Sequence, residues 1–161
     1  MQHRARFEIW GENELIFVND GSTDASMNIL EVIAQQNKNV RVISFSRNFG
    51  HEAAMIAGID HAAGDVIICM DADLQHPLEC IAPIMAKFEE GYEVISMVRT
   101  SNKSAGAIKN FTSRAFYRVI NALSDQVKLE ENASDFFAIS SRVADVLRTN
   151  YREKTRFLRG Y

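Results

Sequence analysis

The chain has 161 residues, of which 47% are hydrophobic and 24% charged, and its formal net charge is −3 at pH 7. This length predicts a single domain, residues 1–161, large enough to bury a core. The slightly acidic balance argues against a surface built for nucleic acid. No apolar run approaches the ~18–20 residues that a membrane-spanning helix needs.

Strand and helix patterns alternate from residue 14 onward. Apolar runs predict strands at 14–18, at 40–45, after Gly64-Asp65, at 92–98 and at 136–140. Helical spacing predicts helices at about 24–37, 51–63, after Pro77 to Glu90, at 107–124 and at 142–151. Ser22 or Thr23 is expected to cap the first helix, and residues 125–134 are expected to form a loop.

This alternation predicts an α/β fold with a mostly parallel sheet and helices on both faces. In such sheets ligands bind beyond the carboxyl ends of the strands. Asp20, Arg47 and the pair Asp71/Asp73 all follow predicted strands. We therefore expect these polar turns to meet at one edge of the sheet.

The acidic pair stands in the segment Met-Asp-Ala-Asp-Leu-Gln-His-Pro, where an apolar strand is expected to end and to carry both aspartates. Residues two apart in an extended strand project to the same side, so Asp71 and Asp73 could converge on one cation. Hard carboxylate ligands suit Mg²⁺ or Mn²⁺ that is shared with a substrate diphosphate. Acids that merely cap the next helix are an equally good interpretation of this motif alone.

For the histidines and cysteines, the sequence favours structural roles over metal binding. His76 precedes a proline, where packing or hydrogen bonding is commoner than metal ligation, and His51 and His61 are too far apart on one helix to face a common ion. Cys69 and Cys80 lack metal-site spacing and indicate buried or incidental thiols. The basic residues near the carboxyl end fit a solvated helix face or an anionic surface equally well; they are Arg142, Arg148, Arg152, Lys154, Arg156 and Arg159.

Six segments in order resemble the inverting polyprenyl-phosphate glycosyltransferases of the GT-A fold, a group that includes dolichol-phosphate mannosyltransferase and the bactoprenol glucosyltransferases. Their order and spacing match the family over nearly the whole chain after residue 14. The segments are Phe17–Asp24, Ser44–Gly50, Met70–Pro77, Phe116–Asn121, Ser134–Phe136 and Thr155–Gly160.

The resemblance implies metal-dependent transfer of a hexose from a nucleotide diphosphate sugar to a polyprenyl phosphate, at the cytoplasmic face of a membrane. UDP-glucose is the first donor to test, and Mg²⁺ or Mn²⁺ is the implied cofactor. The residues implied to bind nucleotide are Asp20, Gly21, Ser22 and Asp71. Those implied to hold the metal are Asp71, Asp73 and Gln75.

The same resemblance places cations near the donor or acceptor phosphates; they are Arg47, Arg99, Lys109 and Arg114. Asp135 would act as the base or orient the acceptor, and Asp73 would take part in catalysis through the metal. Since a phosphate monoester is mostly ionised near neutral pH, Asp135 is expected to orient the acceptor more than to deprotonate it.

The chain also departs from the family pattern. Residues 1–13 hold no Pro-x-Tyr-Asn-Glu strand, Phe137 replaces an arginine, and relatives continue beyond residue 161 into membrane helices. We therefore expect a fragment or a degraded copy of a longer enzyme, with the family's first strand missing and an open sheet edge that favours self-association. The alternatives are an inactive truncated domain and, ranked lower, a phosphohydrolase of the haloacid-dehalogenase type.

Overall fold

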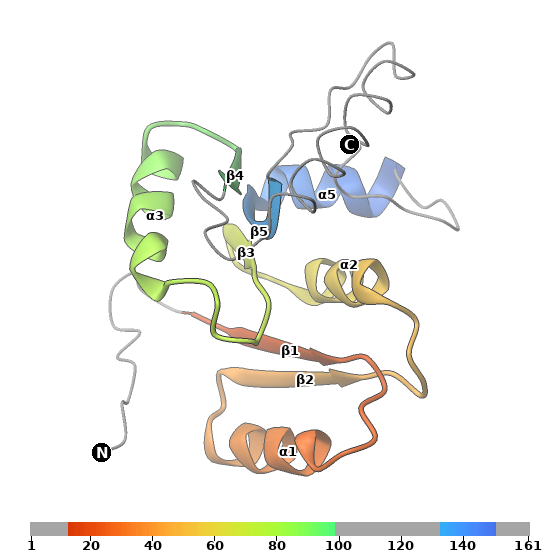
Figure 1. The fold of residues 1–161 in the computed structure, drawn as a ribbon. Helices are drawn as coiled ribbons and strands as arrows, with labels where there is room; N and C mark the ends of the chain where they lie inside the picture. Colours follow the sequence, from red (N-terminus) through yellow and green to blue (C-terminus); the bar gives the residue numbers. More distant parts are fainter. Residues whose placement is uncertain (1–12, 99–132, 151–161) are drawn as a thin grey trace, which may run out of the picture.

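The computed structural model describes residues 13–98 and 133–150 (Figure 1). The strands are β1 (Leu15–Asn19), β2 (Val40–Ser44), β3 (Val66–Cys69), β4 (Val94–Val98) and β5 (Ala133–Ser140). The helices are α1 (Ser26–Gln36), α2 (His51–His61), α3 (Ile81–Glu89), α5 (Ser141–Asn150) and a short 3₁₀ turn, η1 (Leu78–Cys80). The predicted helix at 107–124 lies outside the described residues.

Strands β1 and β2 form a parallel pair that runs from Leu15 opposite Val40 to Asn19 opposite Ser44. Parallel neighbours need a crossover connection, and α1 supplies it. Helix α1 packs on this pair, and α2 packs on β1 as well. Asn19 and Ser44 thus lie side by side at the carboxyl end of the pair, which places the two turns that follow them next to each other.

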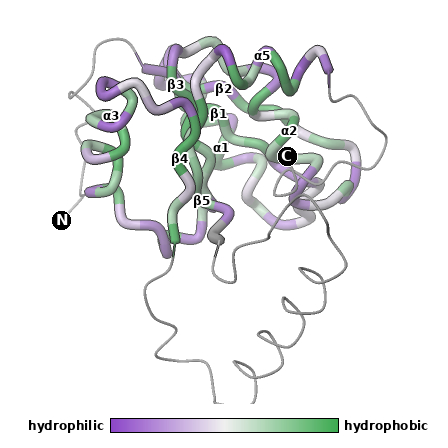
Figure 2. The backbone as a smooth tube through the Cα atoms, turned by 90° about the horizontal axis from the view of Figure 1, so that it is seen from above, coloured by the Kyte–Doolittle hydropathy of each residue, from purple (hydrophilic) through white to green (hydrophobic). Residues whose placement is uncertain are grey.

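The second sheet has β5 at its centre, antiparallel to both β3 and β4. Its side chains alternate between two faces, as strand geometry requires. Phe136 and Ala138 pack with Ile84 of α3 on one face. Ile67 and Ile139 pack with residues of α2 and α5 on the other. Figure 2 shows the result, with hydrophobic strands between α3 on one side and α2 and α5 on the other.

The α/β class with helices on both faces is therefore confirmed, and β3 and β4 are parallel to each other because both run against β5. Strands β1 and β3 belong to separate sheets, although α2 contacts both of them. No strand within residues 13–98 and 133–150 lies between the two. The missing sheet member, self-association and the single-domain boundary stay predictions.

Three local expectations were wrong. Helix α1 begins after Ala25 with no side-chain cap; the carboxylate of Asp24 accepts the Ser26 N–H at 3.0 Å instead, so neither Ser22 nor Thr23 is needed there. Strand β3 ends at Cys69, before the acidic pair. Strand β5 begins at residue 133 rather than 136 because it extends alongside β4 as far as Val98.

The basic residues of α5 serve the fold. Arg148 donates hydrogen bonds to the carbonyls of Ile59 and Ala62, at the carboxyl end of α2. Arg142 pairs with Glu93. The solvated-face interpretation is thus incomplete for Arg148, whereas Arg142 is 76% exposed and fits it. The other basic residues of that group lie outside the described part of the chain. Among the residues that the structure describes, no helix is both long and apolar enough to cross a membrane.

Candidate active site

The turn after β1 is fastened to the turn after β2 by one carboxylate. The Oδ1 atom of Asp20 accepts the Phe49 N–H at 2.7 Å, and its Oδ2 atom accepts the Gly50 N–H at 3.0 Å. Gly50 is the residue that precedes α2, so Asp20 satisfies backbone donors at the start of that helix. The predicted nucleotide contact of Asp20 therefore shares this carboxylate with a structural role.

The close approach of these two turns requires glycine at position 21. Its φ is +71°, and a Cβ atom placed on it would lie 2.4 Å from the carbonyl carbon of Arg47 and 2.6 Å from the nitrogen of Asn48. Only glycine fits this approach without moving backbone atoms. Ser22 donates its backbone N–H to the buried side chain of Asn19. The motif Asn-Asp-Gly-Ser thus forms a turn that its own hydrogen bonds and the packing of Gly21 hold in place.

Arg47 is an exposed residue in the turn that follows β2. Its guanidinium carbon stands 4.3 Å from the centre of the Phe49 ring, a cation–π geometry. Phe49 in turn meets Phe45 edge to face, with ring centres 5.5 Å apart. The guanidinium is held on an exposed aromatic side chain, which keeps its N–H groups available to an anion. Its predicted phosphate contact stays a prediction.

Asp71 and Asp135 converge on one histidine. The Nε2 atom of His51 lies 3.8 Å from Oδ1 of Asp71 and 3.6 Å from Oδ2 of Asp135. The strand pairing brings them near each other, because the last pair of β3 and β5 is Cys69 with Phe137 and Asp71 and Asp135 each lie two residues from it. His51 is the first residue of α2, the helix that packs against β3.

A second histidine contacts Asp71 from the other side. The Nε2 atom of His76 lies 3.4 Å from Oδ2 of Asp71, and its ring packs 4.9 Å from that of Phe136. The side chain of His76 is 5% exposed, whereas that of Asp71 is 32% exposed. This agrees with the packing and hydrogen-bonding role expected for His76, and leaves part of the Asp71 carboxylate open to solvent.

Asp73 and Gln75 lie in the exposed loop that follows. Oδ1 of Asp73 accepts the Gln75 N–H at 3.0 Å, which closes a tight local turn. Leu74, between them, has a φ of +62° and is 95% exposed. Because β3 ends at Cys69, strand alternation does not orient Asp71 and Asp73 as expected. Backbone strain at an exposed apolar residue beside an acidic motif is typical of a functional loop.

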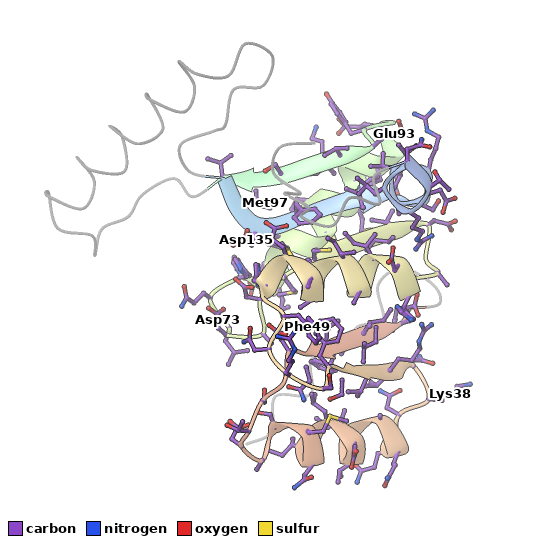
Figure 3. The ribbon with its side chains drawn as sticks, turned by 90° about the vertical axis from the view of Figure 1, so that its right-hand side faces the viewer. Lys38, Phe49, Asp73, Glu93, Met97 and Asp135 are labelled. Atoms are coloured by element: carbon purple, nitrogen blue, oxygen red, sulfur yellow. The ribbon has the colours of Figure 1, made fainter. Side chains whose placement is uncertain are left out.

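Figure 3 shows where these groups gather: Asp73, Asp135 and Phe49 lie toward one end of the strands, and Lys38 and Glu93 toward the opposite end. These groups lie at one end of the strands rather than at one edge of a single sheet, because β1 and β2 form one sheet and β3 belongs to another. We call this end the polar edge. It includes the Asp20 turn, the turn that carries Arg47, and the Asp71–Asp135 pair, which are connected through Phe49, Gly50 and His51. Arg99, Lys109 and Arg114 lie outside the described residues, so their predicted roles remain untested.

Sequence reasoning missed His51 and Asn19. The distance between His51 and His61 along their helix argues only against a shared ion, whereas the position of His51 directly after the Arg-Asn-Phe-Gly turn indicates that it lies at the polar edge. Asn19 is 6% exposed and its amide donates to Ser44 Oγ at 3.2 Å. An asparagine at the end of an apolar strand is the feature of the sequence that could have indicated this contact between turns.

The thiol of Cys69 is not suited to nucleophilic or metal-binding chemistry. Burial raises its pKa to about 12, so it stays protonated near neutral pH. Within the described ranges, no group of three or more His, Cys, Asp or Glu side chains is arranged to hold a metal ion by itself.

The sequence matches a known protein family and several curated relatives. Residues 4–148 match the family described as glycosyl transferase family 2. The chain is 42% identical over 147 residues to an uncharacterized glycosyltransferase, YkcC, of Bacillus subtilis, covering 91% of the chain and 45% of that protein. It is 38% identical over 149 residues to a bactoprenol glucosyl transferase of Shigella phage SfV, covering 92% and 48%.

A prophage bactoprenol glucosyl transferase homolog of Escherichia coli has the same 38% identity, with 92% of the chain and 48% of the relative covered. The chain thus spans about half the length of the curated relatives it matches. The family match disfavours the phosphohydrolase alternative, because it covers the strand and loop that carry the acidic motif. The extent of this match, together with the polar edge described above, shows that the chain belongs to glycosyl transferase family 2.

Proposed function

We propose that the protein of which this chain forms part transfers a hexose from a nucleotide diphosphate sugar to a polyprenyl phosphate with inversion. In this reaction a phosphate oxygen of the lipid bonds to the anomeric carbon, the bond from that carbon to the diphosphate breaks, and the nucleoside diphosphate leaves. The convergence of Asp71 and Asp135 on His51 is the observation that carries the proposal. It sets a carboxylate of the donor motif beside the carboxylate predicted to face the acceptor.

The residues present fit a divalent cation that is shared with the substrate. Asp71 is partly exposed, and Asp73 uses Oδ1 in its local turn, which leaves its second oxygen for a ligand. Such partial carboxylate sets, completed by phosphate oxygens and water, are how Mg²⁺ is commonly bound. Asp71, Asp73 and Gln75 are therefore the proposed ligands. When bound, Mg²⁺ or Mn²⁺ would supply positive charge that stabilises the departing diphosphate.

The chain's own residues would bind and orient the substrates. Asp20, Gly21 and Ser22 form the turn proposed to hold the nucleotide. Arg47, in the adjoining turn after β2, would bind the phosphates. Asp135 would orient the acceptor phosphate, whose oxygen is already ionised near neutral pH and needs no strong base. UDP-glucose is the proposed donor, a choice supported by relatives that are named bactoprenol glucosyl transferases.

The decisive test is transfer from radiolabelled UDP-glucose, with GDP-mannose and other nucleotide sugars in parallel, to undecaprenyl phosphate in detergent. Asp73→Asn is expected to lower the rate on the order of 10²–10³-fold, as loss of one electrostatic partner commonly does. Asp65→Asn is the matched control because Asp65 is an exposed residue at the opposite end of β3. Near-normal turnover by a folded Asp73→Asn variant would refute the role of Asp73.

An inactive domain is the competing proposal, favoured by the absence of any described strand between β1 and β3. Binding of UDP and GDP in the presence and absence of Mn²⁺, measured by calorimetry, separates the two. A catalytic domain should bind one nucleotide in a Mn²⁺-dependent manner. A domain that has lost its donor site should bind neither.

A further inference from the structure

We infer that His51 is a positioning residue that holds the Asp71 and Asp135 carboxylates together at the polar edge. The inference rests on the proposed function, in which one carboxylate serves the donor and the other the acceptor. The contact of His51 with Asp71 would then set the distance between the two half-sites.

The geometry brings two carboxylates from different parts of the chain to one imidazole. The pairing of β3 with β5 ends with Cys69 opposite Phe137, and Asp71 and Asp135 each lie two residues from that last pair. The Nε2 atom of His51 lies 3.8 Å from one carboxylate and 3.6 Å from the other, while His76 contacts Asp71 from the other side. His51 also begins α2, where the helix dipole favours nearby negative charge. The imidazole therefore lies where it can hold the two carboxylates in place.

The position of His51 is itself fixed. Asp20 accepts the backbone N–H groups of Phe49 and Gly50, the two residues directly before His51. Gly21 packs against the backbone of the same turn. A displacement of the Asp20 turn would therefore move the start of α2 and, with it, the imidazole. This links the proposed nucleotide turn to the Asp71–Asp135 pair through a short run of backbone.

His61 provides an internal control on the same helix. It occupies the last position of α2, is exposed, and its Nδ1 atom lies 2.9 Å from the carbonyl oxygen of Ala57. Replacing His61 removes an imidazole of similar exposure from the far end of the helix. An effect that appears with His51 and not with His61 therefore belongs to the polar edge rather than to helix α2 in general.

The contact is tested first without reference to activity. Long-range ¹H–¹⁵N spectra of the histidine rings should show the His51 nitrogens shifting in both Asp71→Asn and Asp135→Asn. The His61 nitrogens should stay in place, and Asp65→Asn should move neither ring. Unchanged His51 resonances in both Asp71→Asn and Asp135→Asn would overturn the inference, whether or not the chain transfers sugar.

Kinetics then test the positioning role. His51→Leu is expected to lower kcat by about 10²-fold, the scale of a small misplacement of reacting groups. His51→Lys should restore much of kcat because a flexible ammonium can reach both carboxylates, and His61→Leu should behave as the unmodified chain. Normal kcat for His51→Leu in an active chain overturns the inference and leaves the proposed function standing. Absence of transfer by the unmodified chain counts against the proposed function, and the ring spectra still decide the contact.

Discussion

Replacing Gly21 by alanine should weaken the fold more than any other glycine substitution in a described turn. The φ of +71° alone costs a residue with a Cβ about 1–2 kcal/mol. The added Cβ would also lie 2.4 Å from the carbonyl carbon of Arg47, and backbone cannot rotate away as a side chain can. Overpacking of this kind costs about 1–3 kcal/mol. Gly21→Ala is therefore expected to lower the free energy of unfolding by about 2–5 kcal/mol.

Gly91→Ala separates the two contributions. Gly91 has a φ of +95°, and nothing lies within 4 Å of the position of its Cβ, so its cost is the backbone term of about 1–2 kcal/mol. Both substitutions restrict the unfolded chain equally, so that effect cancels in the difference. Urea denaturation followed by circular dichroism measures both. Equal losses for Gly21→Ala and Gly91→Ala would refute the close packing of the two turns.

Two other predictions concern stability rather than catalysis. Arg148→Met should lower the free energy of unfolding by about 1.5–3 kcal/mol, because it removes charged hydrogen bonds to the Ile59 and Ala62 carbonyls. Arg142→Met removes an exposed ion pair and should lower it by less than about 1 kcal/mol in the same urea titration. Burial raises the pKa of Cys69 from 9.0 to about 12, so the folded state binds the thiol proton more tightly, and that stabilisation is complete below pH 9 and lost as the pH rises toward 12. The unmodified chain should therefore lose stability relative to Cys69→Ala over that range, and a constant difference between them would contradict the predicted burial effect.

Much of the architecture was predictable because it follows from local pattern. Apolar runs of strand length and helical spacing located the observed strands and helices to within a few residues, and the polar turns after β1, β2 and β3 predicted one functional edge. Boundaries failed where a tertiary contact overrode the local signal. Strand β5 begins earlier than its composition suggests because β4 offers backbone partners as far as Val98.

The candidate site was predictable in its members and not in its contacts. The motif around Asp71 was visible in the sequence, whereas its approach to Asp135 depends on the pairing of β3 with β5, two strands that lie far apart along the chain. The structural use of Asp20 as an acceptor for Phe49 and Gly50 was equally hidden. A hydrogen bond between two turns leaves no mark in the spacing of either one.

The sequence by itself thus determined the alternation of strands and helices, the edge at which polar residues follow the strands, and the family. Only the tertiary structure decided that β1 and β3 lie in separate sheets and that His51 stands between two carboxylates. The physical reason is that periodicity reports how one segment buries its own apolar face. Which segments then become neighbours depends on hydrogen bonds and packing between parts of the chain that share no local pattern.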